Sequence, residues 1–301
     1  MAGAMRQRFV DVTTGLLERD QRLMLLLADL SAEMFQQAIF RHPTRAINFG
    51  IREQLMIDAA GGMALAGMRP IVHSFAPFLI ERPFEQIKIS LNHQGAGAML
   101  VSAGASYDIS SGGRTHQSPG DVALLGTLAD WTVHVPGHED EAEHLIRAGA
   151  ARDGLVYVRL SNQSNTLPLA PSGESLVVLR RGTLGVVIAV GPMADVVIAA
   201  TEGMDITLLY TPTPRPLDAA ALRTFVAGQS AAPVAVVEPL LEGTSAEEVR
   251  AAMGPTFTRL LMVGVPRPEL RNYGSAAQHA RAHGLDPMSL RRRLISFFEH
   301  P

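Results

Sequence analysis

The chain has 301 residues, of which 47% are hydrophobic and 18% are charged, and its formal net charge is −3 at pH 7. This composition is typical of a globular protein of about two domains, and the lack of Lys/Arg runs argues against nucleic acid as a partner. Because the chain has no cysteine, disulfides, thiol catalysis and Cys-based metal sites are excluded.

Charges are spread through the first segment, residues 1–22 (MAGAMRQRFVDVTTGLLERDQR), so it lacks the apolar centre of a signal peptide. The apolar runs elsewhere stop well short of the roughly 20 residues that a membrane span needs. We therefore expect a cytoplasmic protein that makes no membrane contact.

Short apolar runs alternate with amphipathic stretches in the first half of the chain. Six runs predict strands at 23–30, 46–49, 70–75, 98–103, 131–136 and 155–160. Helical periodicity between them predicts helices at 31–41, 51–67, 76–93 and 138–150. Continuously apolar strands that alternate with helices predict a parallel sheet covered on both faces.

Ser, Asn, Pro and Gly interrupt this pattern in SNQSNTLPLAPSGES (161–175). They predict a linker, which we place at 166–180. A second round of predicted strands follows at 185–191, 205–210, 233–238 and 258–264. The predicted fold class is therefore α/β, with two doubly wound domains, 1–165 and a smaller one at 181–301.

The long polar segment GASYDISSGGRTHQSPGD (104–121) fits neither a strand nor a helix. A loop of this length inside a compact domain is usually functional.

A carboxylate stands where a predicted strand meets a predicted helix in NFGIREQLMIDAAGGMALAG (48–67). Ligands bind beyond the carboxyl ends of strands in open α/β sheets, which makes Glu53 a candidate site residue. The alternative is that Glu53 only complements the helix dipole, an effect of roughly 0.3–1 kcal/mol. The adjacent Gly61 and Gly62 predict close packing between helix and sheet.

The segment RAINFGIREQLMIDAAGGMALAGMRPIVHSFAPFLIERPFEQIK (45–88) resembles the pyrimidine-binding domain of transketolases, which are thiamine-diphosphate enzymes. GGRTHQS (112–118) and PGHEDEAEHLIRAG (136–149) follow in the order that the family shows. TPTPRPLD (211–218), VAVVEP (234–239) and VGVP (263–266) extend the resemblance. It covers nearly the whole chain and implies a pyrimidine-binding domain followed by a transketolase C-terminal-like domain.

The resemblance also implies roles for individual residues. A glutamate at the position of Glu53 hydrogen-bonds N1′ of the cofactor's aminopyrimidine and so promotes deprotonation of the thiazolium carbon. Phe75 and Phe78 fall where aromatic residues line and stack on the pyrimidine ring. His116 corresponds to a histidine near the reacting carbon. Read without the family, the two phenylalanines could be core residues and His116 a solvent-exposed loop residue.

The other half of the family's cofactor site is missing from this chain. In the family, a Gly-Asp-Gly motif holds the diphosphate through a divalent metal, and no GDG occurs here. No His/Asp/Glu cluster has metal-ligand spacing either, so we predict no metal site within the chain. The resemblance implies an N-terminal partner subunit that carries this motif with Mg²⁺ or Ca²⁺, plausibly in an α2β2 heterotetramer.

The residues on the substrate side depart from the family pattern. Gly112 stands where an aspartate contacts a donor hydroxyl, and Asn162 stands where an arginine usually binds the substrate phosphate. Arg114 is the one new cation in the active-site loop, and it could meet a carboxylate, meet a differently placed phosphate or remain solvated. We therefore expect weak use of xylulose 5-phosphate and a preference for a less phosphorylated or carboxylate-bearing substrate.

Three functions remain open at this level. The first is a subunit of a transketolase-like enzyme that transfers a two-carbon ketol unit. The second is the β subunit of a 2-oxo-acid dehydrogenase, which shares the two-domain layout. The third is a non-catalytic interaction subunit, although a buried carboxylate such as Glu53 would then cost stability without a task.

Overall fold

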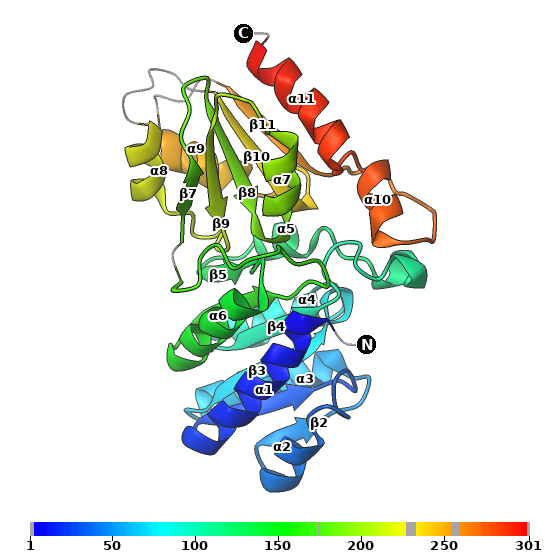
Figure 1. Ribbon diagram of the computed structural model, residues 1–301. Helices are drawn as coiled ribbons and strands as arrows, with labels where there is room; N and C mark the ends of the chain where they lie inside the picture. Colours follow the sequence, from blue (N-terminus) through cyan, green and yellow to red (C-terminus); the bar gives the residue numbers. More distant parts are fainter. Residues whose placement is uncertain (1–2, 174, 227–232, 255–258, 300–301) are drawn as a thin grey trace.

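The structure is a computed structural model that describes residues 3–173, 175–226, 233–254 and 259–299. Within these residues the chain builds two β-sheets, each flanked by helices, and the sheets lie one above the other in Figure 1. The described part of the chain contains no helix that is long and apolar enough to cross a membrane. The predicted α/β fold class is confirmed.

The first sheet is parallel throughout, with the strand order β2-β1-β3-β4-β6-β5 in the described residues. Its strands are β1 (Leu23–Leu27), β2 (Ala46–Asn48), β3 (Arg69–Phe75), β4 (Met99–Ala103), β5 (Trp131–His134) and β6 (Leu155–Arg159). Side chains alternate between the faces, so Leu25 and Leu27 join one core cluster while Met24 and Leu26 join another. Both faces are buried, which explains why each strand reads as a continuous apolar run.

The α-helices of the first half are α1 (Ala4–Arg19), α2 (Gln36–Arg41), α3 (Glu53–Leu65), α4 (Phe84–Gln86), α5 (Asp121–Leu125) and α6 (Glu139–Ala151). The sequence predictions did not include α1, because charged residues are spread along it. Its buried residues Phe9, Val12 and Leu17 belong to the core cluster that α6 also covers, and the two helices lie side by side in Figure 1.

The segment predicted as one helix at 76–93 has a less regular form. Two π-helices, Pro77–Glu81 and Ile87–His93, flank the short helix α4. Short 3₁₀ turns occur at Ser110–Gly112, Arg114–His116 and Gly191–Met193. Because π-turns are frequent at functional sites, the first of the two π-helices is notable: it directly follows β3.

The second sheet has the order β11-β10-β8-β9-β7 in the described residues. Its strands are β7 (Val177–Arg180), β8 (Val186–Val190), β9 (Thr207–Thr211), β10 (Val234–Leu241) and β11 (Leu260–Val265). Its α-helices are α7 (Ala194–Ala200), α8 (Ala219–Val226), α9 (Ala246–Met253), α10 (Ala276–Ala282) and α11 (Pro287–Glu299). The first residue of the predicted strand 258–264 lies outside the described residues.

The linker predicted at 166–180 is wrong at its C-terminal end. Residues 177–180 form β7, the edge strand of the second sheet, which pairs antiparallel with β9. All four residues of β7 are only partly buried. Such a strand lacks the continuous burial that made the parallel strands recognisable from the sequence.

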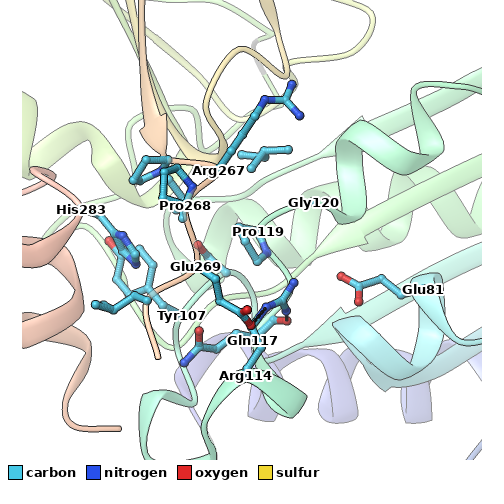
Figure 2. Close-up of a pocket in the computed structure, with 15 residues that line it drawn as sticks. Glu81, Tyr107, Arg114, Gln117, Pro119, Gly120, Arg267, Pro268, Glu269 and His283 are labelled. Atoms are coloured by element: carbon cyan, nitrogen blue, oxygen red, sulfur yellow. Dashed lines mark hydrogen bonds and ion pairs between the residues drawn. The ribbon is translucent and has the colours of Figure 1, made fainter. Parts of the chain in front are cut away.

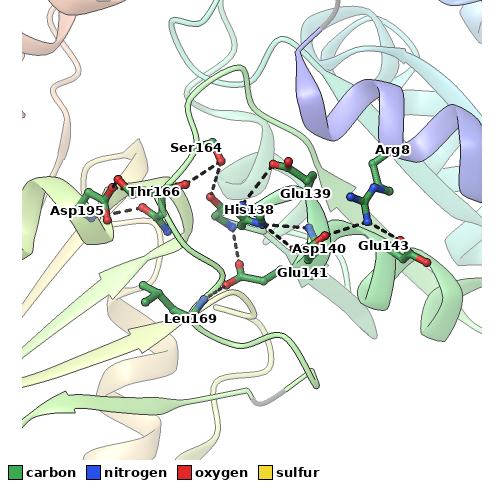
Figure 3. Close-up of polar contacts among 12 residues, drawn as sticks. Arg8, His138, Glu139, Asp140, Glu141, Glu143, Ser164, Thr166, Leu169 and Asp195 are labelled. Carbon is green, nitrogen blue, oxygen red and sulfur yellow. Dashed lines mark hydrogen bonds and ion pairs between the residues drawn. The ribbon is translucent and has the colours of Figure 1, made fainter.

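A buried carboxylate joins the two halves of the chain. Glu141, at the start of α6, accepts hydrogen bonds from the backbone N–H groups of Gly137, Leu169 and Ala170 and from the hydroxyl of Tyr210 on β9. Figure 3 shows the Glu141 carboxylate beside Leu169. Burial, followed by the neighbouring Glu141 charge, raises the pKa of Tyr210 well above its ordinary value. This cluster ties α6, the linker and the second sheet together.

The glycine pair in α3 has a different packing partner from the predicted one. A methyl group at Gly61 would lie 2.4 Å from the backbone oxygen of Ser90 on the second π-helix, so Gly61 lets two helical segments approach closely. Gly62 is exposed, and a methyl group there would meet nothing within 4 Å. The close contact is therefore between helices, and only one of the two glycines makes it.

This difference predicts opposite effects for two adjacent substitutions. Gly61→Ala should lower the free energy of unfolding by roughly 1–3 kcal/mol through overpacking. Gly62→Ala is the matched control and should raise it by up to about 1 kcal/mol, because alanine is the better helix former. Urea unfolding of the two full-length variants measures both changes. Equal changes in the two variants would contradict the assigned packing.

Candidate active site

Glu53 is the first residue of α3, close behind the end of β2. The turn between them uses Gly50 at φ +68°, whose N–H donates to Oδ1 of Asn48. The Glu53 side chain is buried, with the residue 1% exposed. Its Oε2 accepts a hydrogen bond from Arg82 Nη1 at 2.8 Å, and its Oε1 accepts one from Ser74 Oγ at 3.3 Å. One carboxylate oxygen is therefore firmly held, while the other has only a long contact.

Arg82 is a site residue that the sequence analysis missed. Its guanidinium forms the ion pair with Glu53 and lies over the ring of Phe78, 4.1 Å from the ring centroid. The buried charge of Glu53 is thereby compensated, as a buried carboxylate requires. The available signal was the four-residue spacing of Phe78 and Arg82, which places both side chains on one side of a helical segment.

Three rings gather beside this ion pair. Phe75, at the end of β3, and Phe78, in the first π-helix, lie with ring centroids 6.2 Å apart. The ring of His116 meets both edge-on, 5.8 Å from Phe75 and 5.2 Å from Phe78. The Thr115 hydroxyl contacts Nδ1 of His116 at 3.0 Å. Four residues singled out from the sequence, Glu53, Phe75, Phe78 and His116, thus form one cluster, which Arg82 connects.

The loop that carries His116 is held at both ends. An isolated antiparallel bridge joins Ser106 to Ser118, and the Ser118 hydroxyl donates to Glu81 at 2.7 Å. Gly113 adopts φ +69°, and a methyl group there would lie 2.7 Å from the ring of Tyr273. The long polar segment is therefore an ordered wall between the ring cluster and the C-terminal part of the chain.

A fully buried ionic network supports the end of this loop. Oδ2 of Asp121 accepts hydrogen bonds from Arg159 Nε and from the Tyr157 hydroxyl, each at 2.7 Å. Nη2 of Arg159 also donates to the carbonyl of Ser118. Burial raises the pKa of Tyr157 well above its ordinary value, and the Asp121 charge adds to this effect. Arg159 is 0% exposed, so its role is to hold the loop rather than to bind a substrate phosphate.

The structure does not bring Asn162 to the ring cluster. Its backbone N–H donates to Asp108 Oδ2 at 2.7 Å, and its side chain lies against Gly3 at the start of α1. Asp108 also accepts hydrogen bonds from Ser161 and Gln163. Asn162 therefore belongs to a capped turn after β6, and its assignment as a substrate residue stays a prediction.

Arg114 is turned away from the ring cluster toward the second half of the chain. Its Nε pairs with Glu269 at 3.2 Å, and its Nη1 donates to the carbonyl of Gln117 at 2.7 Å. Figure 2 shows Arg114 beside Glu269 and Gln117 in a cavity between the two halves. Arg114 therefore has an ion-pair partner within the chain, so its presence in the loop does not require a charged substrate.

His73 and His93 lie outside this cluster. His73 is buried in β3, where its ring contacts the Ser31 hydroxyl at 2.9 Å and the Val101 carbonyl at 2.7 Å. Burial lowers the pKa of His73 to about 4, so it is neutral at physiological pH. His93 is exposed. Among the described residues, no group of three or more His, Asp or Glu side chains could hold a metal ion.

The chain is an α/β protein in which a buried carboxylate and three aromatic rings gather beside the first sheet. More specifically, the chain belongs to the transketolase family. Residues 2–166 match the family described as "Transketolase, pyrimidine binding domain". The family predicted from the sequence is confirmed, and membership implies the use of thiamine diphosphate.

Similar proteins span nearly the same length as this chain. It is 47% identical over 290 residues to an uncharacterized 33.6 kDa protein in the fasciation locus of Rhodococcoides fascians, covering 96% of this chain and 93% of that protein. It is 29% identical to a 6-deoxy-6-sulfo-D-fructose transketolase subunit of Clostridium sp., covering 72% and 71%. A solved structure described as "Split gene transketolase, inactive beta4 tetramer" superimposes with a TM-score of 0.83 at 22% identity, covering 98% of both chains.

Proposed function

We propose that this chain is the pyrimidine-binding subunit of a thiamine-diphosphate-dependent enzyme that transfers a two-carbon ketol unit. The observation that carries the proposal is the convergence of a buried glutamate, two phenylalanines and a loop histidine from three separate segments. Packing of the core does not require a glutamate at the start of α3, because an apolar residue could be buried there without an ion pair.

The residues present fit the pyrimidine half of such a site. Bound thiamine diphosphate would supply the nucleophilic carbon and the electron sink for the transferred unit. Glu53 would exchange a proton with a ring nitrogen through Oε1, which has only a long contact in the structure, while Arg82 orients the carboxylate through Oε2. Phe75 and Phe78 would line the flat heteroaromatic ring and exclude water. His116 would donate a hydrogen bond to an oxygen of the transferred unit.

The diphosphate half of the site would come from a partner subunit. The sequence contains no GDG motif, and the described residues contain no candidate metal cluster. Two similar proteins support this view, since one is described as a transketolase subunit and the other as an inactive tetramer of β chains of a split enzyme. We infer a partner that carries the motif with Mg²⁺ or Ca²⁺, an α2β2 assembly and a cytoplasmic location.

The substrate of this enzyme would differ from that of sugar-phosphate transketolases. The loop carries Gly112 where the family has an acidic residue, and Asn162 replaces the expected arginine. Arg114 is engaged with Glu269, so it adds no free cation at the ring cluster. A phosphate would therefore lose a charge-assisted contact of roughly 1.5–3 kcal/mol unless the partner supplies it. This supports a less phosphorylated substrate, whereas a carboxylate-bearing substrate would need Arg114 to leave Glu269.

The other two functions have less support. The relative described as a 6-deoxy-6-sulfo-D-fructose transketolase subunit favours ketol transfer over the β subunit of a 2-oxo-acid dehydrogenase. A non-catalytic subunit would have no use for a buried carboxylate, paired with Arg82, next to three converging rings.

Partner dependence is the direct test of the proposal. The pure 301-residue chain should show no ketol transfer and no micromolar binding of thiamine diphosphate with Mg²⁺, because the diphosphate anchor lies elsewhere. Co-expression with a GDG-bearing partner should yield a stable complex that binds the cofactor. Calorimetric titration measures the binding, and assays with ketose phosphates and 2-oxo acids measure transfer. Micromolar binding of the cofactor by the chain alone would refute the split-enzyme reading.

A further inference from the structure

A cavity lies between the two halves of the chain, outside the ring cluster (Figure 2). Its volume is about 320 Å³, at the lower end of the usual range for small-molecule sites. One wall is the back of the loop that carries His116, and the opposite wall is the connection from β11 to α10. Glu53, Phe75, Phe78 and His116 are not among its lining residues.

Two buried residues that line this cavity each carry a side-chain atom with no hydrogen-bond partner in the described part of the chain. The atoms are Ser106 Oγ and Gln117 Nε2, on residues that are 1% and 6% exposed. A buried polar group without a partner destabilises the fold, so each needs an explanation. Ser106 forms the backbone bridge with Ser118, and Gln117 directly precedes Ser118. The bridge therefore holds both residues in place. Neither atom has accessible surface in the structure, so a small rotation of each side chain is needed before the hydroxyl groups of a ligand in the cavity can meet them.

The charged residues around the cavity are balanced, with Arg114 and Arg267 against Glu81 and Glu269. Arg114 pairs with Glu269, and both side chains are about half exposed, so this pair is weak. Glu81 accepts from a serine hydroxyl and retains acceptor capacity. Arg267, at the rim in Figure 2, makes no ion pair with any described residue. The walls thus offer both donors and acceptors, with one unpaired cation at the edge.

The remaining wall is flat and largely apolar. The ring of Tyr107 lies 5.4 Å from that of His283, and Pro119 and Pro268 line the same space. Burial lowers the pKa of His283, which favours its neutral form. Rings and prolines of this kind pack against the C–H groups of a carbon chain.

We propose that this cavity binds a small polyhydroxylated molecule that carries one anionic group, such as a phosphorylated polyol. Its hydroxyls meet Ser106, Gln117 and the two glutamates, and its anionic group meets Arg267. Because Gln117 directly follows His116, occupancy of the cavity restrains the loop from the side opposite the ring cluster. Binding to this site does not depend on the proposed enzymatic function.

The test measures binding of sorbitol 6-phosphate, sorbitol and inorganic phosphate to the full chain by NMR titration and calorimetry. Sorbitol 6-phosphate has no carbonyl group, so it cannot act as a ketol donor. We expect it to bind more tightly than either of the other two probes. Arg267→Gln should weaken its binding about tenfold and leave sorbitol unchanged. Gln117→Leu should weaken both polyols by about three- to tenfold, with no loss in thermal midpoint, because it removes an unpartnered polar atom.

Two control variants locate the bound molecule. Arg250→Gln removes one charge from the exposed face of α9, away from the cavity lining, and should leave the affinity within twofold. Glu53→Gln alters the ring cluster and should also leave it unchanged. The proposal is overturned if none of the probes binds at millimolar concentration, or if phosphate alone binds as tightly as sorbitol 6-phosphate. It is also overturned if Glu53→Gln weakens binding as much as Arg267→Gln does.

Discussion

Glu53→Gln is expected to slow hydrogen–deuterium exchange at the reactive carbon of bound thiamine diphosphate by roughly 10²–10⁴-fold in the complex with the partner subunit. Glutamine keeps the size of the side chain and can donate a hydrogen bond, but it cannot exchange a proton with the ring nitrogen. It also loses the charge that pairs with Arg82 at 2.8 Å. Quenched-flow exchange followed by NMR of the extracted cofactor measures the rate.

Two further measurements separate this role from a structural one. Glu85→Gln, an exposed change of the same chemistry on α4, should leave the exchange rate unchanged. The Glu53→Gln complex should keep its partner affinity and its thermal midpoint within a few degrees. Exchange at the unmodified rate in a well-folded Glu53→Gln complex would disprove the assigned role.

Asp121→Asn is expected to lower the free energy of unfolding by about 3–5 kcal/mol, the usual cost of breaking a buried ion pair. The substitution leaves the guanidinium of Arg159 buried without its counter-charge, and Nη1 of Arg159 already has no partner in the described residues. The Tyr157 hydroxyl loses its charged acceptor in the same step. Urea unfolding followed by circular dichroism measures the change.

The matched control is Asp153→Asn, since Asp153 pairs with Arg22 at 3.4 Å on the surface and is 83% exposed. Its effect should stay within about 0.5 kcal/mol. The double variant Asp121→Leu with Arg159→Met should recover most of the lost stability, because both charges leave together. A double variant that is less stable than Asp121→Asn would show that shape rather than charge dominates this cluster.

The convergence of Glu53, Phe75 and Phe78 was predictable because each lies at or just after the carboxyl end of a strand of the first sheet. Phe75 and Phe78 fall at the end of a strand and in the helical turn after it, and Glu53 lies in an equivalent strand-to-helix turn. In a parallel sheet the carboxyl ends of strands meet at one edge, so such residues converge whatever the details of packing. The alternation of apolar and amphipathic segments specified the first sheet for the same local reason.

The substrate-side predictions had no such local support. Arg114 and Asn162 were assigned by position in a loop and after a strand, yet the structure directs one to Glu269 and the other to Gly3. The partners of both residues lie far along the chain. Such partners follow from how the second sheet and α1 pack on the first, which no short-range pattern records.

The alternation of strands and helices, the family and the absence of the diphosphate motif could all be read from the sequence, because they depend on residue type and short spacings. Only the tertiary structure decided that Arg82 compensates Glu53, that Gly61 packs against Ser90, and that β7 completes the second sheet. Those contacts join segments whose approach is set by the burial of whole apolar faces. The free energy of that burial is a property of the packed chain and is not carried by any single stretch of residues.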